Sequence, residues 1–145
     1  MGIEKICQRD VCVAQLDETI QDAAQRLHDL DVGSLVVLDG DKKPIGILTD
    51  RDVALRIVCD AKDPKTTTVS DIMTSHPVTI PMTTSNEDAL KRMRVLGVRR
   101  LIVADNEGRL AGIVALDDII AQHVEEMTLI GGILEITSPS GSIMI

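Results

Sequence analysis

The sequence predicts an α+β protein made of two tandem β-α-β-β-α repeats that pack about a pseudo-two-fold axis. The main observation is a duplication, in which Gly46–Asp52 corresponds without a gap to Gly112–Asp118. The offset of 66 residues holds over 52 aligned pairs and gives 12 identities, where chance gives about three. The second observation is that each copy shows helical apolar spacing followed by two short apolar runs. Because neither copy alone buries enough surface, we expect the copies to share a core.

Each repeat is expected to open with a short strand, at Val11–Val13 and at Val78–Ile80, and to continue into an amphipathic helix. Thr19 and Ser85 each stand three residues before an aspartate, which is typical of a helix N-cap. Apolar residues then recur at helical spacing, and Gly97 is the expected C-cap of the second of these helices.

A hairpin follows the helix in each repeat. Its strands are expected at Ser34–Leu38 and Pro44–Leu48, and at Leu101–Val103 and Leu110–Val114. Turn sequences rich in Asp and Gly separate the two strands of each pair. A second helix is expected from about residue 50 to 58, and from about 117 to 127.

Residues 60–68 are polar and read as a linker, so we divide the chain into a first repeat at 1–63, a second at 64–127 and an apolar tail at 128–145. Gly131-Gly132 interrupts the tail, and Ser138–Gly141 ends any regular element. Two interpretations of the tail stay open. It is a helix extension or stray strand that covers an edge, or it contacts a partner, because an uncovered apolar segment favours association.

Composition excludes several classes of function. The chain has 145 residues, a net charge of −8 and no Phe, Tyr or Trp. Nucleic-acid binding is disfavoured, because it relies on basic residues and on aromatic stacking. With 44% hydrophobic and 26% charged residues the chain is expected to be folded.

No catalytic or metal-binding pattern is visible. The sequence shows neither a Ser-His-Asp constellation nor a Walker-type loop, so we expect no enzyme, no catalytic cofactor and no metal. The cysteines are expected to be small buried hydrophobes in a reducing cytoplasm. With neither a signal peptide nor a membrane span in view, the expected location is cytoplasmic. The side chains that could otherwise bind a metal are those of Cys7, Cys12, Cys59, His28, His76 and His123.

The doubled pattern resembles a tandem pair of CBS domains, also called a Bateman module, over roughly residues 3–127. The likeness rests on Gly46–Asp52, Gly112–Asp118, Val69–Thr74 and Val98–Asp105. The resemblance implies a regulatory adenosyl ligand, such as AMP, ADP or ATP, with S-adenosylmethionine or NAD as alternatives. It also implies a homodimer that regulates another protein, here an unknown one.

The first motif offers the better candidate site. Thr49 stands where a strand meets a helix, so nearby N–H groups favour an anion, and Arg51 is a candidate phosphate ligand. The resemblance implies that Asp52 binds a ribose diol. The same Thr-x-x-Asp spacing also serves as a capping box without any ligand, and that alternative stays open.

The second motif departs from the first. Ala115 lacks the hydroxyl of Thr49, although Asp118 is kept. The resemblance implies that Arg99 and Arg100 form a basic pair that grips phosphate, so Arg100 is a candidate partner for a nucleotide held by Asp52. The chain therefore favours one good site in a shared cleft over two equal ones.

Without aromatic residues, an adenine base must lie between aliphatic side chains. The candidate walls are Ile47, Met73, Pro77 and Val78, together with Val11–Val13 and Ile113. Core packing explains these residues equally well. Two functions remain: a regulatory module that binds an adenine nucleotide, or a structural dimerisation protein with degenerate ligand sites.

Overall fold

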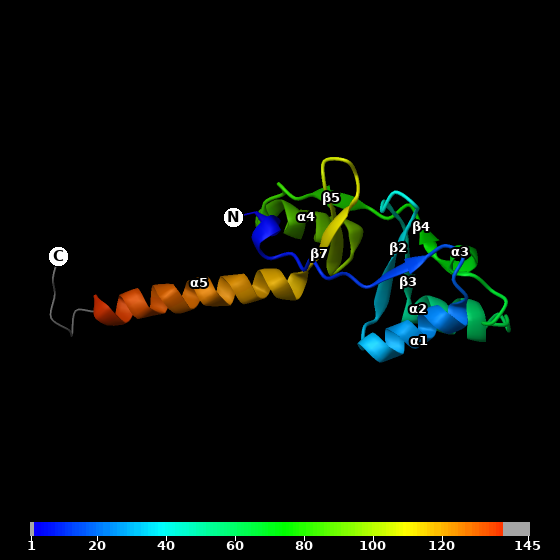
Figure 1. Ribbon diagram of the computed structural model, residues 1–145. Coiled ribbons are helices and arrows are strands. Elements are labelled where there is room, and N and C mark those ends of the chain that lie inside the picture. Colours follow the sequence, from blue (N-terminus) through cyan, green and yellow to red (C-terminus); the bar gives the residue numbers. More distant parts are fainter. Residues whose placement is uncertain (1, 138–145) are drawn as a thin grey trace.

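The computed structural model describes residues 2–137 and confirms the duplicated α+β fold (Figure 1). The first repeat forms β1 (Val13–Gln15), α1 (Ile20–Leu30), β2 (Ser34–Leu38), β3 (Pro44–Thr49) and α2 (Asp50–Val53), which continues as π-helical turns, η2 (Ala54–Val58). A 3₁₀ turn, η1 (Ile3–Lys5), precedes it.

The second repeat follows the same order after a short leading helix. Its elements are α3 (Val69–Ile72), β4 (Thr74–Ser75), β5 (Thr79–Pro81), α4 (Asn86–Leu96), β6 (Arg100–Ala104), β7 (Leu110–Ala115) and α5 (Leu116–Ile136). The sheets have the orders β1-β2-β3-β4 and β5-β6-β7, with parallel β1/β2 and β5/β6 pairs and antiparallel hairpins.

The helix boundaries of α1 and α4 agree with their sequence signals. The side chains of Thr19 and Ser85 accept hydrogen bonds from the third residue of each helix, and Gly97 ends α4 in the left-handed conformation. The opening strands lie slightly later than expected, because β1 pairs with β2 only from Val13 onward. Val11, two residues before β1, packs against the cluster between the two sheets.

The leading segments of the two repeats, residues 3–8 and 69–74, are exchanged. Gln8 pairs with Ile113 of β7, and Thr74 pairs with Ile47 of β3, its equivalent under the 66-residue offset. Ile3 is fully buried in the core of the second repeat, whereas Val69 is fully buried in the core of the first. Each repeat therefore completes the core of the other.

Two glycines permit this exchange. A Cβ at Gly112 would lie 2.7 Å from the carbonyl oxygen of Gln8, and one at Gly46 would collide with Sδ of Met73. Only glycine lets the leading segment cross the strand this closely. The glycine within the second strand of each hairpin thus makes room for the leading segment of the other repeat.

A third cluster joins the two sheets. Val36, Leu38 and Ile102 are buried in it, and Ile47 and Ile113 pack against it from the two hairpins. All are aliphatic, as a chain without aromatic residues requires. Not every cysteine is buried as expected, since Cys59 is exposed after η2.

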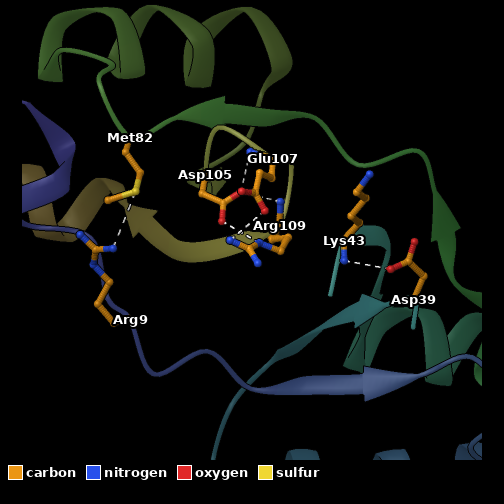
Figure 2. Close-up of polar contacts among 7 residues, drawn as sticks. All are labelled: Arg9, Asp39, Lys43, Met82, Asp105, Glu107 and Arg109. Atoms are coloured by element: carbon orange, nitrogen blue, oxygen red, sulfur yellow. Dashed lines mark hydrogen bonds and ion pairs between the residues drawn. The ribbon is translucent and has the colours of Figure 1, made fainter. Parts of the chain in front are cut away.

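The two hairpin turns lie near each other and are closed by aspartates (Figure 2). The backbone amides of Lys43 and Arg109 donate to Asp39 and Asp105, each at 2.9 Å. The amide and the guanidinium of Arg109 lower the pKa of Asp105. Because Arg109 also pairs with Glu107 at 3.0 Å, its charge is already matched by acidic neighbours.

The last helix is longer than expected. We expected it to end at about residue 127, but α5 continues through Gly131-Gly132 to Ile136 and projects away from both sheets (Figure 1). A glycine pair only weakens a helix and does not by itself stop it. The first half of the tail is thus a helix extension that covers no sheet edge, while residues 138–145 lie outside the described residues. No helix within residues 2–137 is long and apolar enough to cross a bilayer.

Candidate ligand site between the repeats

A cleft lies where the two repeats meet, with a volume of about 190 Å³. Both repeats and the segment before β1 line it. Its residues are Gln8, Asp10, Val11, Cys12, Asp31, Val32, Ser34, Arg100 and Ile113.

Ser34 and Arg100 occupy equivalent positions in the two repeats and face the same cleft. Ser34 begins β2 and pairs with Thr49, whereas Arg100 begins β6 and pairs with Ala115. The cleft is therefore lined by one pair of equivalent positions, with a hydroxyl from the first repeat and a guanidinium from the second.

Asp118 does not line this cleft but is hydrogen-bonded to Gln8, which does. Its Oδ1 accepts a hydrogen bond from Gln8 Nε2 at 3.2 Å, and its Oδ2 accepts one from the Ala115 amide at 2.8 Å. A carboxylate has about four lone-pair sites, so Asp118 retains acceptor capacity for a ligand hydroxyl.

The first motif forms the capping box that its spacing allows. The Asp52 amide donates to Thr49 Oγ1, and the Thr49 amide donates to Asp52 Oδ2, both at 3.0 Å. Arg56 Nε lies 3.8 Å from Asp52 Oδ1, while Arg51 is exposed on α2. These residues lie next to the cleft through Ser34 but do not line it.

The two arginines of the basic pair point to different surroundings. Arg99 pairs with Asp117 at 3.2 Å and is largely exposed. Arg100 lines the cleft, and its side chain has neither an ion pair nor a hydrogen bond among residues 2–137. Of the two, Arg100 is the cation placed to meet a ligand.

The expected aliphatic walls are only partly brought together. Ile47 packs at the junction of the sheets, and Met73 packs against the core of the first repeat beside Gly46. Pro77 and Val78 lie in the segment between β4 and β5, outside the lining of the cleft.

Sequence reasoning placed Val11, Cys12 and Ile113 among the walls and Arg100 among the ligands, but it missed the rest of the polar lining. Gln8, Asp10 and Asp31 belong to no motif, because each lies in a connection rather than in a strand. Applying the 66-residue offset to Arg100 would have indicated Ser34 as a site position.

A family model for the CBS domain matches the chain twice, at residues 3–58 and 69–125. An uncharacterized protein of Methanopyrus kandleri is 32% identical over 120 residues, which are 83% of this chain and 61% of that protein. The chain thus spans less than two thirds of that relative.

Hypoxic response protein 1 of Mycobacterium tuberculosis is 33% identical over 128 residues, which are 88% of this chain and 87% of that protein. A crystal structure of Hypoxic Response Protein I with two coordinated zinc ions gives a TM-score of 0.75 at 30% identity, covering 85% of this chain and 98% of that one. In residues 2–137 of the present chain, no group of three or more His, Cys, Asp or Glu side chains is placed to hold a metal ion.

A CBS domain pair solved with 5-methylthioadenosine and S-adenosyl-L-methionine gives a TM-score of 0.73 at 24% identity, covering 85% of this chain and 99% of that one. At 24% identity, this likeness supports a shared fold and nothing further.

Proposed function

We propose that this protein, which belongs to the CBS domain family because the family model matches most of the chain, is a regulatory module. In this proposal it binds an adenosine-containing ligand between its two repeats. The observation that carries the proposal is the cleft, where Arg100 has no side-chain partner among residues 2–137 and Gln8 holds Asp118 by a hydrogen bond.

In this proposal each polar group has a chemical role. Asp118 accepts hydrogen bonds from the ribose hydroxyls, and Arg100 donates to an anionic group of the ligand. The aliphatic side chains of Val11, Val32 and Ile113 contact the base. This arrangement binds and positions a ligand, and it offers no nucleophile activated by a neighbouring base.

The first motif supplies a second set of candidate ligands. We propose Thr49 and Asp52, with Arg51, Ile47, Met73, Pro77 and Val78, as the ligand-binding residues of a second position, which the 66-residue offset relates to the cleft. AMP, ADP and ATP are the candidate ligands there. The capping role of Thr49 and Asp52 is compatible with binding, because the Asp52 carboxylate retains free lone pairs.

The proposed output is a contact with another protein, and the proposed place of action is the cytoplasm. A ligand that bridges the repeats stabilises their relative placement, and a partner that senses this placement is regulated.

Calorimetric unfolding with AMP, ADP, ATP, NAD, 5-methylthioadenosine and S-adenosylmethionine tests the proposal. A ligand at 100 times its dissociation constant stabilises a protein by about 2.7 kcal/mol. We expect at least one of these ligands to do so. If none does, the module has no adenosyl site.

A matched pair of variants separates binding from capping. Asp52 and Asp71 each accept a hydrogen bond at 3.0 Å from the threonine that caps their helix, Thr49 and Thr68. Asp52→Ala and Asp71→Ala should both lower stability, but only variants near the cleft, Asp52→Ala or Asp118→Ala, should remove ligand stabilisation.

A specific observation also favours dimerisation, which we propose through α5. Ile120, Val124, Met127, Gly131 and Leu134 follow alternating steps of four and three residues, the spacing of a coiled-coil seam. The side chains of this seam are exposed, Met127 to 65%. A second copy of this chain offers the same seam and is the proposed occupant.

Sedimentation velocity tests this second proposal. Wild-type chain should sediment as a dimer, and Met127→Glu should sediment as a monomer. Val95→Glu, at an apolar position that is 79% exposed on α4, is the control and should leave the dimer intact. A dimer that no adenosyl ligand stabilises would favour a purely structural role.

A further inference from the structure

The cleft carries an unusual set of charges for a site that is expected to hold a nucleotide. Asp10 and Asp31 line it together with Arg100. Among residues 2–137, no ion pair or side-chain hydrogen bond engages any of these three side chains. Two carboxylates and one guanidinium are thus all available to a ligand.

The repeat provides an internal comparison. Under the 66-residue offset, Asp10 corresponds to His76 and Asp31 to Gly97. Neither residue on the other side carries a carboxylate. The fold therefore does not require this acidic pair.

The conformation of Asp31 supports this reading. Asp31 and Gly97 both end a helix in the left-handed conformation, with φ of 52° and 67°. Glycine is the usual residue at such a C-cap, since it has no Cβ to strain. The first repeat instead carries an aspartate at this position, and this aspartate is among the residues that line the cleft.

We propose that the cleft beside Asp118 selects adenosyl ligands with a cationic, amino-acid-bearing 5′ substituent, and disfavours adenosine polyphosphates. This inference rests on the proposed function and narrows the ligand of one cleft. The preferred ligand carries two positive groups and one carboxylate, as S-adenosylmethionine does in its sulfonium, ammonium and carboxylate. Asp10 and Asp31 face the cations, and Arg100 binds the carboxylate.

A triphosphate fits this set of charges poorly. Arg100 attracts one part of it, but two carboxylates in the same cleft repel the rest. We expect S-adenosylmethionine to occupy the cleft at a concentration about tenfold lower than ATP does, since like-charge contacts disfavour the wrong ligand.

Cys12 provides a readout for this cleft. Cys12 and Asp10 also line a neighbouring pocket beside Glu18, which Asp31 does not line, so the contribution of Asp31 distinguishes the two. Cys12 is half-buried in the cleft lining, Cys7 is buried, and the exposed Cys59 is removed by Cys59→Ser. The rate at which a thiol reagent modifies Cys12 is measured in the full chain with increasing S-adenosylmethionine, 5-methylthioadenosine, AMP or ATP.

S-adenosylmethionine should protect Cys12 best. In the double variant Asp10→Asn/Asp31→Asn, the ratio of half-protecting concentrations should move at least tenfold toward ATP. Asp60→Asn removes one negative charge outside the cleft and is the control, in which the ratio should not move.

The outcomes separate this inference from the proposed function. If ATP protects Cys12 as well as S-adenosylmethionine does, or if the double variant leaves the ratio unchanged, the charge selection is wrong. If ligands stabilise the protein without protecting Cys12, they bind elsewhere and only this inference fails. If no adenosyl ligand protects or stabilises the chain, the proposed function fails as well.

Discussion

Gln8 and Ile113 exchange both of their backbone hydrogen bonds. The Gln8 amide donates to the Ile113 carbonyl at 2.7 Å, and the Ile113 amide donates back at 2.9 Å. The residue that leads into the first repeat is thereby a strand partner of the second. Several expectations depend on how tightly this crossing is packed.

The crossing makes Gly112 harder to replace than its equivalent, Gly46. An added Cβ at Gly112 meets backbone, the Gln8 carbonyl oxygen, whereas at Gly46 it first meets the flexible side chain of Met73. We expect Gly112→Ala to lower the free energy of unfolding by about 1–3 kcal/mol, and Gly46→Ala to lower it less. Urea unfolding measures both. Gly40→Ala, where an added Cβ meets nothing within 4 Å, is the control; equal losses at Gly112 and Gly46 would contradict the prediction.

Thr49 and Ala115 are the equivalent N-cap residues of α2 and α5. Both residues have extended backbone with similar angles, but only Thr49 offers a hydroxyl, 3.0 Å from the Asp52 amide. Thr49→Ala should lower stability by about 1 kcal/mol, and Ala115→Thr should raise it by about 0.5–1 kcal/mol. Thermal unfolding of the two variants checks this. A destabilised Ala115→Thr would show that a side chain there meets an obstacle.

Arg99 and Arg100 are neighbours in sequence but should differ in their effect on binding. Arg100 lines the cleft, while Arg99 pairs with Asp117 at the surface. Arg100→Ala should weaken AMP binding about tenfold or more, because a charge-assisted hydrogen bond is lost. Arg99→Ala should change it by less than about threefold. Titration calorimetry gives both affinities, and an unchanged affinity in Arg100→Ala removes this residue from the site.

The Glu18–Arg26 pair should make stability depend on pH. The Arg26 guanidinium contacts Glu18 at 2.5 Å and lowers the pKa of its carboxyl below the usual 4.5. A lowered pKa contributes stability above the unfolded-state value, and this contribution is lost as the pH falls through the folded-state pKa.

Glu18→Gln should therefore lower stability at pH 7, by at most about 1 kcal/mol because solvent screens the partly exposed pair. The difference from wild type should shrink at acid pH. Urea unfolding at several pH values measures it. Glu87→Gln breaks the fully exposed pair with Lys91 and should have no measurable effect; a difference at Glu18 that persists at low pH would rule out ionisation as its cause.

Local sequence signals were sufficient for most of the fold. The caps at Thr19, Ser85 and Gly97, and the turns at Asp39 and Asp105, act on neighbouring backbone, so their residue types predict them. The length of α5 was underestimated, because the Gly131-Gly132 pair suggested a break that the helix does not make.

The candidate site was less predictable, because its residues meet only through long-range contacts. Thr49 and Asp52 form a local capping box that spacing reveals. Asp10 and Asp31 lie in connections, and no periodic pattern relates them to Arg100. Their meeting depends on how one repeat packs against the other, which the motifs of a single repeat do not encode.

The exchange of leading segments also constrains how the chain reaches its native state. Gln8 and Asp118, which share a hydrogen bond, are 110 residues apart in the sequence. During synthesis, residues 3–8 leave the ribosome before the rest of the two repeats, yet Gln8 has no strand partner until β7 has been made. Such distant contacts close late and slow folding. Ile3 and Cys7 of the leading segment therefore stay uncovered until the second repeat has been made, and a nascent chain stalled in the second repeat should be the species most exposed to aggregation and chaperone capture.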